Sequence, residues 1–171
     1  VITTNGGGFV YQTDKEGEQL ENYTKYKLKS SDELAALLAD KDNLFVVACN
    51  KCFKEFETID EPECGEFIEF AAAQGKTVTG SMKVDFLCNK RATEKKLQDA
   101  IPEGTEHVVV ISCGLGIQTV ADLAGKPIVA ASDSLNYTGH HGMALTKKTC
   151  DACAQCYLNI TGGICPIVDC S

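Results

Sequence analysis

The chain has 171 residues, of which 44% are hydrophobic, so it can bury the core of one domain and still carry a small additional segment. Its formal net charge is −8, and so acidic a chain is repelled by phosphate backbones, which excludes nucleic acid as an expected partner. No apolar run is long enough to span a bilayer, so we expect no membrane span.

Ten cysteines are many for a chain of this length. Disulfide frameworks belong mostly to small secreted domains, and the start of the sequence shows no apolar segment typical of a secretory signal peptide. We therefore expect a cytoplasmic location, where clustered cysteines bind metal ions or carry out redox chemistry.

The order of predicted elements begins with a polar, glycine-bearing stretch at residues 1–28, interpreted as an N-terminal arm or hairpin. A capping box at Ser30–Glu33, followed by leucines on one helical face, predicts the first helix. Apolar strands then alternate with helices. The predicted strands cover residues 44–48, 77–87, 107–112 and 128–131, and the predicted helices between them start at Pro62, Ala92 and Gly114 and end near Gly75, Ile101 and Gly125.

Strands separated by helices of this length are typical of a parallel sheet, and their continuous apolar runs indicate that both faces are covered. We therefore predict an α/β fold, an open parallel sheet with flanking helices, at residues 29–132. Residues 133–171 are expected to form a cysteine-rich, irregular, cluster-binding segment.

This C-terminal segment has a cysteine spacing typical of an iron–sulfur site. Its five cysteines are Cys150, Cys153, Cys156, Cys165 and Cys170. The C-x2-C-x2-C triplet places three thiolates on one tight loop, and a cysteine followed by Pro166 closes the site. Bacterial ferredoxins share the triplet and the Cys-Pro ending, with a shorter gap between them. The spacing predicts a [4Fe–4S] cluster, with zinc as the alternative metal.

A second group of cysteines is associated with the predicted strands. Cys49, Cys88 and Cys113 follow strands, Cys52 forms a C-x2-C pair with Cys49, and Cys64 lies at the start of the helix from Pro62. Because ligands of open parallel sheets bind outside the carboxyl ends of the strands, this group is expected to supply four ligands to a second [4Fe–4S] cluster. The helix after Cys113 would point its N-terminus at the charge of that cluster. Cys64 is either one of the ligands or a small buried hydrophobic residue.

The segments around both cysteine groups resemble one known family. The matching stretches are 46–52 (VVACNKC), 86–88 (FLC), 112–118 (SCGLGIQ) and 158–166 (LNITGGICP). From about Ser30 to Cys170 the chain resembles the MetV-type small iron–sulfur subunit of acetogen-type methylenetetrahydrofolate reductase. Nine of the cysteines match family cysteines. Where the family has a further cysteine this chain has Phe56, and Cys64 is the candidate substitute.

The resemblance implies two [4Fe–4S] clusters, held by all or most of the ten cysteines, and no catalytic residue in this chain. It also implies a partner, a MetF-like flavin-containing reductase subunit, and a possible further electron-donor subunit. The implied function is electron transfer to or from that flavin in the Wood–Ljungdahl pathway. One alternative is a zinc-binding structural subunit of the same kind of complex. A thiol–disulfide enzyme using Cys49 and Cys52 is a third interpretation, which leaves eight cysteines unexplained.

Overall fold

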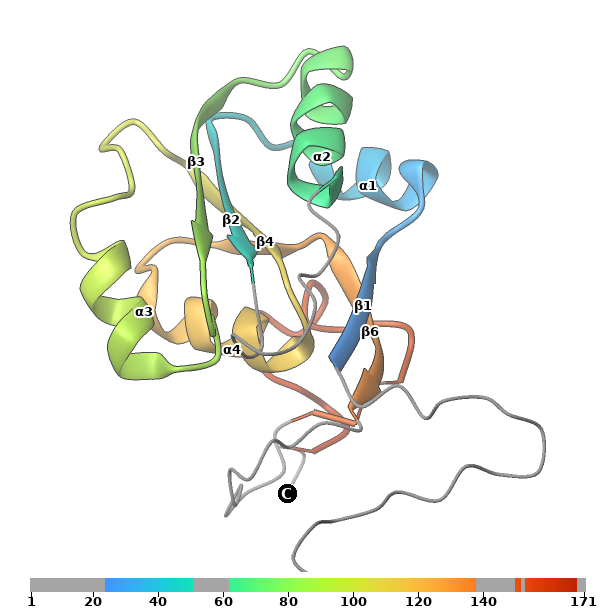
Figure 1. The fold of residues 1–171 in the computed structure, drawn as a ribbon. Helices are drawn as coiled ribbons and strands as arrows, with labels where there is room; N and C mark the ends of the chain where they lie inside the picture. Colours follow the sequence, from blue (N-terminus) through green and yellow to red (C-terminus); the bar gives the residue numbers. More distant parts are fainter. Residues whose placement is uncertain (1–23, 51–61, 138–149, 152, 169–171) are drawn as a thin grey trace, which may run out of the picture.

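The computed structural model describes residues 24–50, 62–137, 150–151 and 153–168 (Figure 1). Its elements in chain order are β1 (Thr24–Leu28), α1 (Ser31–Leu38), β2 (Leu44–Cys49), α2 (Pro62–Ala73), β3 (Val78–Val84), α3 (Lys90–Leu97), β4 (His107–Ile111), α4 (Gly114–Leu123), β5 (Ile128–Ala130) and β6 (Ser132–Tyr137). Every helix and strand expected between Ser30 and Ala131 is present, so the predicted α/β fold is confirmed. No helix in these described ranges combines the length and apolar character needed to span a membrane.

The central sheet has four parallel strands in the order β3-β2-β4-β5. Every residue of β2 is buried, as are the last four of β4. These strands are apolar without alternation because helices cover both faces of the sheet, as the sequence predicted.

The direction in which the chain winds changes between β2 and β4. The chain leaves β2 through α2 towards β3, whereas it leaves β4 through α4 towards β5 on the other side. Right-handed crossovers therefore put α2 on one face and α3 and α4 on the opposite face, as Figure 1 shows. Open α/β sheets bind ligands where the winding direction changes, which here is at the carboxyl ends of β2 and β4.

Local sequence explains where the helices start and stop. Ser30 caps α1, its side chain accepting a hydrogen bond of 3.3 Å from the backbone N–H of Glu33. Asn89 caps α3, which is why α3 begins two residues before the predicted start. Gly75 and Gly125 follow α2 and α4 with φ of +71° and +61°, a conformation that favours glycine.

A two-stranded antiparallel sheet of β1 and β6 lies outside the central sheet. β1 forms the end of the predicted N-terminal arm, whose earlier residues lie outside the described part of the chain. β6 was not predicted, because its sequence SDSLNY has neither an apolar run nor an alternation that would mark a strand. Both domain boundaries stay predictions, and the boundary at residues 132 and 133 falls inside β6.

A buried ion pair ties this small sheet to α1. The Nζ atom of Lys29 lies 2.7 Å from Oδ1 of Asp133 and 2.6 Å from Oε1 of Glu33, and the Lys29 side chain is 0% exposed. Burial alone lowers the pKa of Lys29, but hydrogen bonds and charge from the two carboxylates outweigh it and raise the pKa above its ordinary value of 10.5. Lys29 is therefore a charged group held inside the protein by its partners.

Replacing Lys29 with methionine leaves the Asp133 carboxylate buried without its cation. We expect the free energy of unfolding at neutral pH, measured by urea denaturation, to fall by about 3–5 kcal/mol. A raised pKa stabilises the folded state only while the lysine is protonated, so the difference from wild type should be complete below pH 10.5 and shrink at higher pH.

Lys41 offers a matched control, because it forms an ion pair of 2.6 Å with the exposed Asp40. Lys41→Met should lower the free energy of unfolding by less than about 1 kcal/mol. An equal decrease in the free energy of unfolding for the two variants would show that the buried Lys29 ion pair stabilises the fold no more than an exposed one.

Candidate metal centre

Two serines of β6 fix the elements around the cysteine-rich tail. The Ser132 hydroxyl donates to the carbonyl of Ser112 at 2.7 Å and accepts from its N–H at 2.9 Å, which fixes the end of β4. The Ser134 hydroxyl accepts a hydrogen bond of 2.8 Å from the N–H of Gly114, the first residue of α4. The Ser134 carbonyl accepts from the N–H of Ala154 in the tail, at 2.9 Å. β6 therefore connects the sheet, the start of α4 and the tail.

Asp133 and Asn159 anchor the tail from two further sides. Oδ1 of Asp133, already paired with Lys29, accepts a hydrogen bond of 2.6 Å from the N–H of Cys156. The side-chain amide of Asn159 accepts from the N–H of Ala130 at 2.7 Å and donates to its carbonyl at 2.9 Å. Asn159 thus bonds to β5 much as the backbone of a neighbouring strand would.

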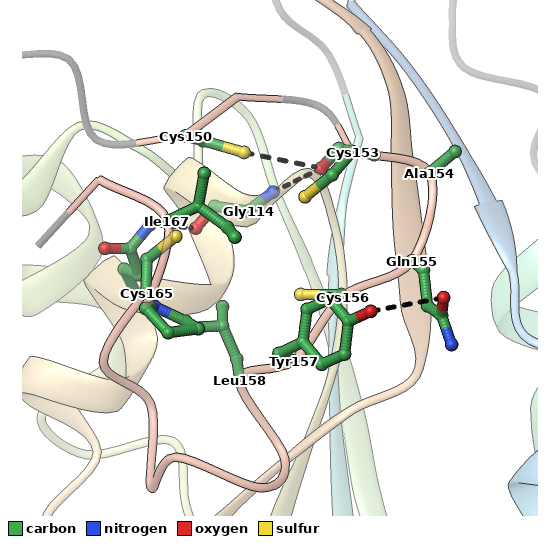
Figure 2. A pocket seen from close by; sticks show the side chains of 13 residues that line it. Gly114, Cys150, Cys153, Ala154, Gln155, Cys156, Tyr157, Leu158, Cys165 and Ile167 are labelled. Atoms are coloured by element: carbon green, nitrogen blue, oxygen red, sulfur yellow. Dashed lines mark hydrogen bonds between the residues drawn. The ribbon is translucent and has the colours of Figure 1, made fainter. Parts of the chain in front are cut away.

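Four of the five tail cysteines line one small hollow that is partly open to solvent. They are Cys150, Cys153, Cys156 and Cys165. Figure 2 shows the side chains of these four cysteines among those that line the hollow. Cys165 is buried and Cys153 is exposed, so the hollow runs from the interior to the surface. The structure thus brings four of the predicted tail ligands to one hollow. Their joint binding of a metal or cluster stays a prediction, and Cys170 lies outside the described residues.

The turn between Cys156 and Cys165 brings the fourth thiol back to the other three. Gly162 and Gly163 have φ of +66° and +92°, which only glycine adopts readily. A Cβ on Gly163 would lie 2.9 Å from the Cβ of Ala121, so the turn also packs closely against α4. The long gap between the triplet and the Cys-Pro pair is thus a folded loop that rests on the body of the protein.

The sulfur of Cys150 lies directly over the start of α4. A Cβ on Gly114 would come within 2.6 Å of this sulfur, which is also 3.9 Å from the Ser134 hydroxyl oxygen. The N-terminus of a helix carries partial positive charge and attracts anionic groups. Sequence reasoning linked this helix end to Cys113 and missed its contact with Cys150.

Burial is the main influence on the Cys156 thiol in the hollow. Burial raises the pKa of Cys156, and the nearby Cys150 and Asp133 add to this effect, while a hydrogen bond with the backbone of Leu158 and the charge of Lys29 oppose it. Metal binding requires the thiolate, so a metal ion would supply the positive charge that stabilises it. Four thiols around one hollow are the donor set that a four-iron cluster takes.

Two members of the second cysteine group lie at the carboxyl ends of the neighbouring strands β2 and β4. Cys49 is the last residue of β2, and Cys113 follows β4 as the N-cap of α4. Both are buried, while Cys88 is half-buried in the turn after β3. Cys64 is buried near the start of α2, and burial raises the pKa of its thiol. Cys52 lies outside the described residues, and joint coordination by this group stays a prediction.

The start of α4 carries one cysteine of the second group and also borders the tail hollow. Cys113 belongs to one group, and the next residue, Gly114, lines the tail hollow. In the parts of the chain that the structure describes, no three histidine, cysteine or acidic side chains form a group that would hold a single metal ion. The four tail thiols instead line the wall of a hollow.

Sequence reasoning missed the residues that position the tail, namely Lys29, Asp133, Ser134 and Asn159. A signal was present in the run Ser132–Ser134, since three polar residues directly after an apolar strand need buried partners or solvent. The partners themselves are too distant in sequence for a local pattern to reveal them.

Gly114→Ala should displace Cys150, because the added methyl group would overlap its sulfur. We expect faster alkylation of Cys150 by iodoacetamide in the metal-free protein, followed by mass spectrometry. Gly65→Ala is the matched control: Gly65 also follows a cysteine near the start of a helix, and an added Cβ there meets nothing within 4 Å. The contact has no structural role if Cys150 reacts at the wild-type rate in both variants.

Comparison with known protein families relates the tail to one enzyme. A family described as "Methylene-tetrahydrofolate reductase C terminal" matches residues 129–171, which include most of β5, all of β6 and the five tail cysteines. A search of curated proteins gave no match. The segment that forms the cysteine-lined hollow is thus similar to the C-terminal region of methylenetetrahydrofolate reductase.

Proposed function

We propose that this chain is an iron–sulfur electron-transfer subunit of a methylenetetrahydrofolate reductase complex, of the MetV type. The observation that carries the proposal is the hollow lined by Cys150, Cys153, Cys156 and Cys165, in a segment similar to the C-terminal region of that reductase. Reduction of the folate substrate would belong to a MetF-like flavin-containing partner, as in the Wood–Ljungdahl pathway, and a further subunit would donate the electrons.

In this proposal the four hollow-lining cysteines hold one [4Fe–4S] cluster, and Cys170 is the remaining candidate ligand of the tail. Such a cluster, when bound, takes up and releases single electrons at a potential set by its surroundings. A second cluster is assigned to Cys49, Cys52, Cys88 and Cys113, with Cys64 as the substitute ligand. The two ligand groups are adjacent at Cys113 and Gly114, which favours a relay between them.

The chain's own residues set the environment of the tail site. The backbone N–H of Cys156 is held by Asp133, which fixes the loop between the second and third thiols of the hollow. The Lys29 ammonium and the N-terminus of α4 contribute positive charge on two sides. Hydrogen bonds and charges around the sulfurs are the means by which a protein tunes such a centre.

Metal analysis of protein purified without oxygen is the direct test. We expect about eight irons per chain and a broad visible absorbance that bleaches on addition of dithionite. Stoichiometric zinc without iron would instead make the chain a structural subunit and would refute the electron-transfer proposal.

Serine at Cys153 or Cys165 should remove the tail cluster alone. Iron should fall from about eight to about four per chain, and reduction of the partner's flavin by the electron donor should slow in stopped-flow measurements. Ala154→Ser is the control for Cys153, since it places the same hydroxyl group at the neighbouring exposed position without removing a thiol. Flavin reduction at wild-type speed in the cysteine variants would exclude the tail from the electron path.

A further inference from the structure

Large apolar side chains gather on the tail loop beside the hollow. Of the five that are exposed in the described part of the chain, four lie in residues 157–167, here called the apolar loop. Ile160 is 82% exposed, Ile164 63%, Ile167 50% and Tyr157 39%. Single exposed hydrophobic residues are common, but a group of them on one short segment marks an interaction surface.

The segment that contains this loop carries no charge. Residues 153–168 include no lysine, arginine, histidine, aspartate or glutamate, although 23% of the whole chain is charged and its net charge is −8. The centres of protein–protein interfaces are depleted in charged residues, whereas solvent-facing loops are usually polar. The composition of the loop therefore fits a surface that another protein covers.

The loop is held in the conformation that exposes its isoleucines. Leu158 points inward and is only 3% exposed, and Asn159 beside it is bonded to β5. The N–H of Gly163 donates to the carbonyl of Leu158 at 2.9 Å, closing the turn. The Thr161 hydroxyl also bonds to backbone carbonyls within the loop. A pre-ordered surface loses little conformational entropy when a partner binds.

The apolar loop also forms part of the wall of the cysteine-lined hollow. Tyr157 and Ile167 are exposed on the outside and line the hollow as well (Figure 2). A protein seated on the loop would therefore cover the opening of the hollow and lie against the segment that carries the thiols.

We propose that the apolar loop is the surface by which this chain docks on the flavin-containing catalytic subunit of the reductase. The inference rests on the proposed function. It favours that occupant because the loop belongs to the segment that is similar to a C-terminal region of the same reductase. Since the loop is uncharged, the matching surface of the partner is apolar and association depends little on salt.

The test uses the full chain and the flavin-containing methylenetetrahydrofolate reductase subunit of the same organism, with binding measured anaerobically by titration calorimetry. Ile160→Lys combined with Ile164→Lys should weaken binding about 100-fold, because two charges would be buried against an apolar surface. Ile160→Ser with Ile164→Ser, which adds no charge, should weaken binding about tenfold.

Ala36→Lys combined with Ala72→Lys is the matched control, because it adds the same two charges at exposed positions of α1 and α2. This variant should bind like wild type. Wild-type affinity in both isoleucine variants would overturn the proposal.

Other occupants of the loop give distinct results, measured on the chain alone. A wild-type dimer that the lysine substitutions dissociate would show that a second copy covers the loop, and would overturn the proposal. A lower unfolding temperature of the isolated chain carrying both serine substitutions would show that residues of this same chain cover the loop. That result would also overturn the proposal.

The electron-transfer proposal and the docking proposal can each be refuted without refuting the other. A chain that contains no iron but binds the reductase through the loop would refute electron transfer and leave docking intact. An iron-loaded chain whose loop variants bind like wild type would refute docking and leave electron transfer intact.

Discussion

The ion pair between Lys29 and Asp133 is the interaction on which the arrangement of the cysteine-rich tail depends. A buried ammonium is tolerated only with close anionic partners, and a buried carboxylate only with donors. Asp133 meets this requirement with the Lys29 ammonium on one side and the backbone N–H of Cys156 on the other. One carboxylate thus joins the segment before α1, the strand β6 and the loop of the cysteine triplet.

Around this pair, the tail is positioned by hydrogen bonds more than by hydrophobic burial. Among the tail residues that the structure describes, only Leu158 and Cys165 belong to the buried core, whereas Ser134, Asp133 and Asn159 fix the tail backbone at separate points. Hydrogen bonds are directional, so they fix where each thiol lies with little apolar area. Because the tail is held with little buried apolar area, the isoleucines of the apolar loop can face outward.

The central sheet could be predicted from sequence because its determinants are local. β2 and β4 are continuous apolar runs, Ser30 begins a recognisable capping box, and Gly75 and Gly125 end helices that precede strands. The edge position of Cys49 and Cys113 followed from the rule that parallel strands end at one edge. β6 could not be predicted, because its polar residues are stabilised by partners far away in sequence. The close approach of Cys150 to Gly114 is likewise a tertiary contact that no local pattern encodes.

The pairing of β1 with β6 has a consequence for the synthesis and engineering of this chain. Lys29 and Asp133 are 104 residues apart, so β1 leaves the ribosome long before its partner strand exists. Contacts this distant in sequence form late in folding. A fragment that begins at residue 129 would contain all the tail cysteines but would leave β6 as an unpaired edge with Asp133 lacking its cation. The smallest unit that can be moved into another protein therefore includes Thr24–Lys29 together with the tail.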